Sequence, residues 1–190
     1  MKALTVFILC GGKSSRMQSE KGLVLFQDKP FIDHIIQAIL PITNQIKLIT
    51  ASKQYDYLEY EKIPDLIVDK GPLGGIYTAL SHSGTEFNLI LSCDIPLIST
   101  ELLQELISKH TKEAGITIFA SESKTHPLIG IYSKNILSVI KESIDSDELK
   151  MMDLLAKLPH QIIKIEENEK FPLTNINSID ELNDLNINLS

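Results

Sequence analysis

The sequence has one arginine and two cysteines among its 190 residues, and it has no excess of basic charge. Its formal net charge is -7 at pH 7. A protein that binds nucleic acid along its surface would carry a basic face, so we do not expect a nucleic-acid partner. A local cluster of cations could still bind a nucleotide. Cys10 and Cys93 have neither the spacing of metal ligands nor that of a disulfide framework.

Long apolar runs are also absent. No stretch reaches the roughly 18 apolar residues that a membrane helix needs, and the N-terminus lacks the pattern of a secretory signal. We therefore expect a cytoplasmic protein without a membrane partner. The chain is 43% hydrophobic and 23% charged, which is typical of a globular protein. Its length suits one α/β domain with a single core.

The clearest functional pattern lies in the first twenty-odd residues. Residues 2–10 form an apolar run, which predicts a strand buried on both faces inside a parallel sheet. Gly11 and Gly12 end this run, and glycines let backbone N–H groups approach an anion closely. Arg16 could hold phosphate oxygens with its planar fork, and Lys21 could add a point charge. The stretch therefore predicts a phosphate-binding loop, with a plain polar surface loop as the alternative.

Two familiar phosphate motifs do not fit this loop. A Walker loop needs a further glycine where Phe7 stands. The dinucleotide fingerprint needs a third glycine after Gly12, and none follows. A nucleotide site built on this loop would therefore belong to another class.

Strand and helix patterns alternate through the first half of the chain, which predicts a doubly wound and mainly parallel sheet. Further strands are expected at 46–50, 66–68 and 87–92, and helices at 31–40, 55–61, after Gly75 and at 100–110. In the second half we expect strands at 115–120, 126–132 and 161–165, an edge piece at 171–173, and helices at 134–143, 148–157 and 178–183. The strand at 126–132 is expected to run antiparallel to a neighbour.

Two aspartates stand at predicted strand ends, Asp69 and Asp94. In open α/β sheets, ligands bind outside the carboxyl ends of the strands. Asp94 follows the apolar strand at 87–92, and Mg²⁺ prefers one or two carboxylates together with substrate phosphates. Asp94 is therefore the strongest candidate metal ligand. The alternative for either aspartate is that it only shapes a turn.

The ordered motifs resemble the signature of nucleotidyltransferases with a Rossmann-like fold, and within that family the molybdenum cofactor guanylyltransferases. The loop residues that match are Leu9, Gly11, Gly12, Ser15, Arg16, Met17 and Lys21. Two positions depart, since Gln18 stands where glycine is usual and Glu20 where aspartate is commoner. Further matching segments are Gly71–Gly75, Cys93–Pro96, His126–Pro127 and 173–182.

The resemblance covers nearly the whole chain and implies its architecture. It implies a three-layer α/β nucleotidyltransferase fold, with a mostly parallel central sheet and an antiparallel addition in the second half. Residues 1–190 would form a single domain. About 1–100 would be the nucleotide-binding half and about 101–190 the acceptor-binding half.

The resemblance also implies roles for particular residues. The catalytic residues would be Arg16, Lys21 and Asp94, with Asp94 as the ligand of Mg²⁺. The nucleotide would contact Leu9, Cys10, Gly11, Gly12, Lys21, Asp69, Gly71 and Asp94. The acceptor would contact His126, Pro127, Asn175 and Asn177. On local grounds alone, the two asparagines could equally be turn formers.

The implied reaction is transfer of GMP from GTP to molybdenum-molybdopterin, with release of pyrophosphate. GTP, molybdenum-molybdopterin and proteins that deliver or receive the cofactor are then the expected partners. The sequence leaves two alternatives. One is a related transferase with another base or acceptor, such as a molybdopterin cytidylyltransferase or a sugar-phosphate nucleotidyltransferase. The other is a nucleotide-binding adaptor without turnover.

Overall fold

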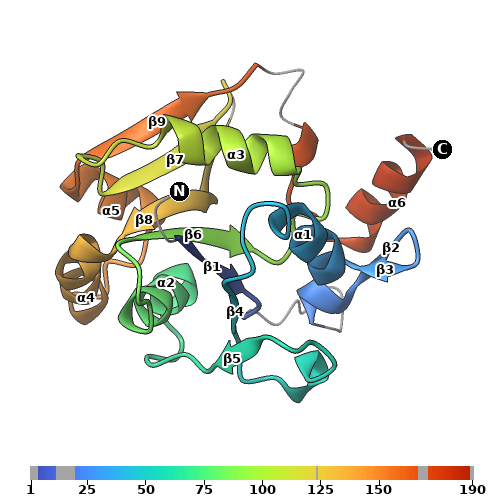
Figure 1. Cartoon of the computed structure of the whole chain (residues 1–190), viewed down its shortest axis with the longest axis horizontal. Helices are drawn as coiled ribbons and strands as arrows, with labels where there is room; N and C mark the ends of the chain where they lie inside the picture. The colour runs from blue at the N-terminus through green and yellow to red at the C-terminus, as the bar shows by residue number, and fades with distance from the viewer. Residues whose placement is uncertain (1–3, 12–19, 123, 167–170, 189–190) are drawn as a thin grey trace.

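A computed structural model describes residues 4–11, 20–122, 124–166 and 171–188 (Figure 1). Within these ranges, seven strands form one sheet. In spatial order they are β5 (Glu61–Ile63), β4 (Ile46–Ile49), β1 (Leu4–Leu9), β6 (Phe87–Ser92), β8 (Thr125–Ser133), β7 (Ile116–Ala120) and β9 (His160–Lys164). A separate two-residue hairpin is made by β2 (Leu25–Phe26) and β3 (Lys29–Pro30).

The strand directions confirm the expected sheet. β5, β4, β1 and β6 pair in parallel, and β7 pairs in parallel with β9. β8 is antiparallel to both of its neighbours, β6 and β7. The carboxyl ends of β1, β4 and β6 therefore meet at one edge of the sheet, and the beginning of β8 lies at the same edge.

Helices cover both faces of the sheet, as Figure 1 shows. Residues of α1 (Phe31–Ile39) and α3 (Thr100–Lys109) pack in one core cluster, and residues of α2 (Gly71–Ser81), α4 (Leu137–Asp145) and α5 (Met151–Lys157) pack in another. Along β1 the side chains alternate between the two clusters: Val6 and Ile8 face the first, and Phe7 and Leu9 face the second. The continuous apolar run of the first strand follows from this burial on both faces.

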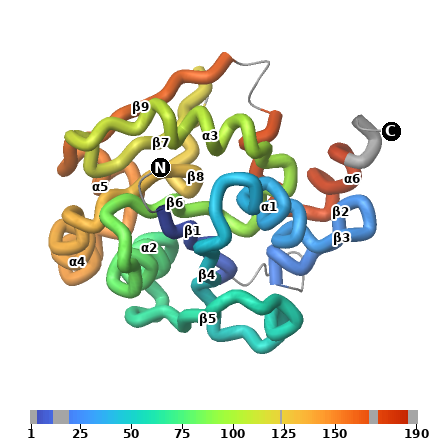
Figure 2. Tube along the Cα trace, viewed as in Figure 1, coloured from blue at the N-terminus to red at the C-terminus, as the bar shows by residue number. Residues whose placement is uncertain are grey.

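The C-terminal segment packs against elements from the first part of the chain. α6 (Ile179–Asn188) lies beside the β2–β3 hairpin (Figure 2). A third apolar cluster joins Ile176 and Leu185 to Phe26 and Phe31. This packing brings the segment before α6 close to the region that follows the predicted phosphate loop.

The strand expected at 66–68 is wrong. The strand that pairs with β4 is β5, and the apolar residues Leu66 and Val68 lie in a turn where they are 53% and 69% exposed. β5 is a short edge strand whose first residue is charged, and Glu61 forms an ion pair with Lys47 of β4 at 2.9 Å. Only Ile63 of this edge strand is buried, so β5 needs no apolar run, whereas the apolar run at 66–68 has the composition of a strand but lies on a turn.

Two smaller expectations are also wrong. The helix expected at 55–61 is replaced by the 3-10 turn η2 (Lys53–Tyr55) and by the start of β5. The edge piece expected at 171–173 is the 3-10 turn η5 (Phe171–Leu173). In the described ranges, no helix is both long enough and apolar enough to cross a membrane.

Candidate functional site

The candidate site lies where β1 and β6 end. These strands are parallel neighbours, and Leu9 pairs with Ser92 at their carboxyl ends. Gly11 and Asp94 follow these paired residues, so the end of the described loop and the candidate metal ligand come together at the edge of the sheet. This is the edge where ligands bind in open α/β sheets.

Asp94 is buried, and donors occupy both of its carboxylate oxygens. Oδ1 accepts hydrogen bonds from Ser92 Oγ at 2.5 Å and from Asn175 Nδ2 at 2.8 Å. Oδ2 accepts from Lys21 Nζ at 3.1 Å. The residue is only 6% exposed, and a buried carboxylate needs such partners. These donors hold the carboxylate in a single orientation.

Lys21 reaches Asp94 because the chain passes closely by the end of β6. Lys21 begins the 3-10 turn η1 (Lys21–Leu23), and Gly22 follows it. A Cβ added to Gly22 would lie 2.8 Å from Tyr55 Oη and 3.2 Å from Cys93 Cβ. Only glycine fits this space without a shift of its neighbours, and the close approach places the lysine beside the carboxylate.

The segment before α6 completes the cluster. The backbone N–H of Ile176 donates to the backbone carbonyl of Asp94 at 2.8 Å, and the Ile176 side chain is buried in the third apolar cluster. Asn175 and Asn177 flank this anchor. Asn175 donates to Asp94, as described above, and Asn177 Oδ1 accepts from Lys21 Nζ at 2.6 Å. Four residues singled out from the sequence, Lys21, Asp94, Asn175 and Asn177, thus form one polar network.

A second carboxylate, which the sequence analysis missed, lies on one side of this network. A Cβ added to Gly11 would lie 3.6 Å from Asp65 Oδ2, and one added to Gly75 would lie 3.8 Å from Asp65 Oδ1. Oδ1 is buried and has no hydrogen-bond partner among the described residues. Burial raises the pKa of Asp65 above its ordinary value. Asp65 follows β5 closely, so a correct placement of that strand in the sequence would have identified Asp65 as a strand-end aspartate.

Asp69 lies in the turn that leads into α2, and Gly71 is the first residue of that helix. Both have left-handed backbone conformations, with φ of 58° and 54°. The Asp69 side chain is exposed, and no hydrogen bond joins it to Lys21 or Asp94 in the described part of the chain. The structure does not bring these two predicted residues into the network.

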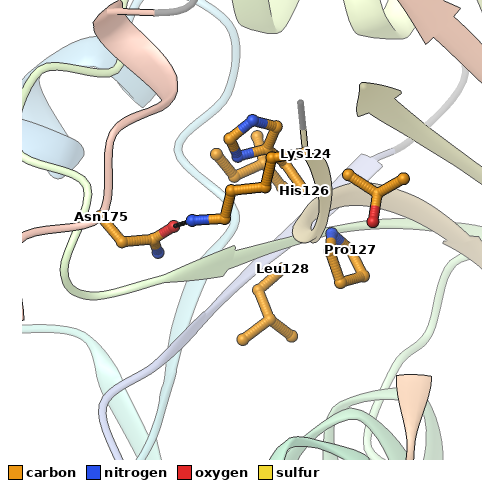
Figure 3. Close-up of a pocket in the computed structure, with 7 residues that line it drawn as sticks. Lys124, His126, Pro127, Leu128 and Asn175 are labelled. Atoms are coloured by element: carbon orange, nitrogen blue, oxygen red, sulfur yellow. Dashed lines mark hydrogen bonds between the residues drawn. The ribbon is translucent and has the colours of Figure 1, made fainter. Parts of the chain in front are cut away.

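A pocket lies on the other side of the network, at the start of β8. On β7, Ile118 and Phe119 are consecutive, but their partners on β8 are Gly130 and His126. The residues 127–129 thus have no partner on β7, and this bulge opens a cavity of about 110 Å³. The cavity is lined by Lys124, Thr125, His126, Pro127, Leu128, Ile129 and Asn175 (Figure 3).

His126 is the unusual group in this pocket. It is 6% exposed, and neither ring nitrogen has a hydrogen-bond partner among the described residues. Burial, and secondly the charge of Lys124, lowers the pKa of His126 to about 4. The imidazole is therefore neutral at pH 7. Lys124 Nζ donates to Asn175 Oδ1 at 3.1 Å, which joins the pocket to the polar network (Figure 3).

The remaining predicted residues belong to the first loop. Leu9 and Cys10 are buried at 8% and 1% exposure, and the Cys10 N–H donates to the Ile49 carbonyl while the Leu9 carbonyl accepts from the Cys93 N–H. A hydrogen bond with Cys93 and burial raise the pKa of the Cys10 thiol. Gly12 and Arg16 lie outside the described residues. No group of three or more His, Cys, Asp or Glu side chains within the described ranges could hold a metal ion.

Comparisons with known proteins agree with this architecture. The family described as MobA-like NTP transferase domain matches residues 6–162. A protein of Flavobacterium johnsoniae named probable molybdenum cofactor guanylyltransferase is 86% identical over 190 residues, which is 100% of both chains. A protein of Carboxydothermus hydrogenoformans with the same name is 34% identical over 167 residues, covering 88% of this chain and 84% of that one.

A solved structure supports the fold. The molybdopterin-guanine dinucleotide biosynthesis protein A of Archaeoglobus fulgidus aligns with a TM-score of 0.79 over 95% of both chains, at 23% sequence identity. At that identity the likeness establishes the fold alone. The family match and the two sequence relatives go further: the chain belongs to the family of MobA-like NTP transferase domains.

Proposed function

We propose that this protein transfers GMP from GTP to molybdenum-molybdopterin, releases pyrophosphate and forms the guanine dinucleotide form of the molybdenum cofactor. The observation that carries the proposal is the polar network of Lys21, Asp94, Asn175 and Asn177 at the strand ends. The network sets a cation and a carboxylate between two flanks, the side that holds Asp65 and the side that holds the His126 pocket. A reaction that joins two substrates needs a separate region for each of them. The names of the sequence relatives support the same reaction.

The chemistry needs no covalent enzyme intermediate. A phosphate oxygen of the acceptor attacks the α-phosphorus of GTP in line, and the bond to pyrophosphate breaks. The protein contributes position and charge. Lys21, the backbone of Gly11 and Gly12, and Arg16 would neutralise the departing pyrophosphate.

The residues present fit a Mg²⁺ ion that is held mainly by substrate. Asp94 supplies a carboxylate at the strand end, and Mg²⁺ commonly takes one or two carboxylates together with phosphate oxygens and water. Oδ2 of Asp94 has only Lys21 Nζ as its partner among the described residues, and Lys21, which also bonds Asn177, could yield this oxygen to the ion. When bound, Mg²⁺ would supply charge neutralisation on the nucleotide phosphates.

The guanine base would be read on the Asp65 flank. The guanine edge presents N1–H and the N2 amino group side by side, and a carboxylate offers two acceptor oxygens to such a pair. Cytosine presents acceptor atoms at the corresponding positions, which a carboxylate would repel. We assign this role to Asp65, which lies beside Gly11 and Gly75 and has a buried oxygen without a partner among the described residues, in place of Asp69, which the resemblance implies.

The acceptor would bind on the opposite flank, against His126, Pro127 and Asn175. This flank offers the imidazole of His126 and the amide of Asn175, which supply hydrogen-bonding groups to the acceptor. We place the reaction in the cytoplasm, where buried free thiols such as Cys10 and Cys93 remain reduced. Proteins that deliver the acceptor or receive the product would dock near this flank.

The decisive experiment measures pyrophosphate release from GTP by the full-length protein with Mg²⁺ and molybdenum-molybdopterin. Release should need both substrates. Thermal shifts with GTP, CTP, ATP and UTP, each with Mg²⁺, then test the base, and GTP should raise the melting temperature most. A larger shift with CTP would favour a cytidylyltransferase, and nucleotide binding without pyrophosphate release would favour the adaptor.

A further inference from the structure

Lys124 differs from the lysines that form ion pairs. In the described ranges, Lys21, Lys47, Lys70, Lys109, Lys141 and Lys157 each contact a carboxylate. The hydrogen bond of Lys124 goes instead to Asn175 Oδ1, a neutral amide oxygen. Its positive charge therefore stands at the pocket without a carboxylate partner among the described residues.

His126 adds a second group that lacks a partner. Buried polar groups in proteins are nearly always hydrogen-bonded, and one that is not calls for an explanation. The neutral imidazole offers one donor and one acceptor nitrogen, and both are buried beside the pocket. A cation with no carboxylate partner and an N–H with no acceptor are together complementary to an anion with several oxygens.

The size of the pocket limits what can enter. Its volume is about 110 Å³. Pockets that enclose a whole drug-sized ligand measure ~300–1,000 Å³. This pocket therefore suits a single group of a larger molecule, such as a phosphomonoester, rather than a complete ring system.

The position of the pocket relates it to the reaction. Lys124 contacts Asn175, and Asn175 contacts Oδ1 of Asp94, whereas Lys21 contacts Oδ2. Lys21 thus bonds one oxygen of Asp94 directly, whereas Lys124 is linked to the other oxygen only through Asn175. In an in-line displacement the attacking oxygen and the leaving group stand on opposite sides of the phosphorus. Lys21 serves the leaving-group side in the proposed reaction, so Lys124 is available to the attacking side.

We propose that Lys124 and His126 bind the terminal phosphomonoester of the acceptor and position it for attack. This inference rests on the proposed function and adds to it a cationic phosphate site on the acceptor flank. Lys124 exchanges its bond to Asn175 for the phosphate, and the His126 N–H donates to a second phosphate oxygen. Lys124 acts here as a positioning residue, because it holds the nucleophile and takes no proton.

Inorganic phosphate is a suitable probe, titrated at constant ionic strength into the full-length protein with labelled histidines. The His126→Gln variant assigns the His126 ring signals in the NMR spectrum. Phosphate should shift the wild-type signals in a saturable manner. Lys124→Gln should weaken this binding about 10- to 100-fold, the loss expected for one charge-assisted hydrogen bond. Lys124→Arg should retain it, and the exposed control Lys112→Gln should match the wild type.

Three results would overturn the inference. They are an absence of saturable shifts, an affinity unchanged by Lys124→Gln, and competition between phosphate and a non-hydrolysable GTP analogue with Mg²⁺. The last would assign the phosphate to the nucleotide site. In turnover assays, Lys124→Gln should raise KM for the acceptor and leave KM for GTP unchanged. A protein that binds phosphate here but releases no pyrophosphate would refute the proposed reaction and leave this anion site standing.

Discussion

The two flanks of the Asp94 network each hold one side chain with an unpartnered buried atom among the described residues, and the two differ in chemistry. On one flank the atom is Oδ1 of Asp65, a carboxylate oxygen that can only accept hydrogen bonds when ionised. On the other flank, both ring nitrogens of His126 lack partners, and the cation of Lys124 stands beside them. One flank is therefore complementary to donor groups and the other to an anion.

The network between the flanks behaves differently. Both oxygens of Asp94 have partners, and Lys21 is shared between Asp94 and Asn177. A centre whose groups already hold one another is preorganised for charge that develops during a reaction. The flanks are left for the substrates to complete. The contrast is that the central groups are satisfied within the protein, whereas Asp65 and His126 each keep a buried atom that a ligand could satisfy.

The largest effect is expected at the centre. Asp94→Asn keeps the shape of the side chain and removes its charge, and deletion of one preorganised electrostatic group costs about 100- to 1,000-fold in turnover. Steady-state pyrophosphate release measured across a range of Mg²⁺ concentrations checks this. The exposed Asp153→Asn variant serves as the control. Turnover of Asp94→Asn equal to the wild type at ordinary Mg²⁺ would exclude Asp94 as the metal ligand.

Lys21 should come next. Lys21→Met removes the cation that contacts both Asp94 and Asn177, and we expect turnover to fall about 100-fold, the lower end of the range for a lost electrostatic group. Arg16→Ala, in the loop outside the described residues, should also reduce turnover. Circular dichroism should show both variants folded, with the exposed Lys29→Met as control. If both instead unfold, the two residues serve the fold, and the centre is not a catalytic cluster.

The Asp65 flank gives the sharpest test of the base. Asp65→Asn replaces one acceptor oxygen by a donor group, and the loss of a charge-assisted hydrogen bond should weaken GTP binding about 10- to 100-fold. Asp69→Asn should leave GTP affinity near that of the wild type, because the proposed guanine contact is made by Asp65, and the exposed Asp69 lies outside the polar network. Calorimetric titration of both variants decides between them. The reverse order of effects would assign the guanine contact to Asp69.

Most of the sheet could be predicted from the sequence because its central strands are buried. The run at 87–92 matches β6 at both ends, and the pattern of apolar residues in 31–40 yields α1. β5 could not be found this way, since a three-residue edge strand with a single buried residue, Ile63, carries little apolar signal, and the turn at Leu66 carries more. That single misplacement hid Asp65 and drew attention to Asp69.

The candidate site was predictable as a set of residues but not as a set of contacts. The motifs named Lys21, Asp94, Asn175 and Asn177, and the structure joins all four. The role of Lys124 depends on a bulge between β7 and β8 and on a neutral hydrogen-bond partner. Neither feature leaves a pattern in a single sequence, because both arise from packing between distant segments.

The two asparagines define the boundary between the flanks, and they give the smallest and most informative effect. The resemblance assigns both to the acceptor, but their contacts differ. Asn175 joins Lys124 to Asp94, and Asn177 accepts from Lys21. We therefore expect Asn175→Ala to raise KM for the acceptor and to leave GTP affinity unchanged. Asn177→Ala should instead weaken GTP binding, because Lys21 loses one of the groups that orient it.

The size of these changes follows from the bonds that are lost. A hydrogen bond within a folded protein contributes about 0.5–1.5 kcal/mol net, so each variant should lose about tenfold or less. Calorimetric titration with GTP, paired with acceptor KM values for the same two variants, separates the cases. Equal GTP affinity in both variants, with raised acceptor KM in both, would place Asn177 with the acceptor as the resemblance implies. The boundary between the flanks would then run between Lys21 and Asn177, and their 2.6 Å contact would join the two substrates' sites.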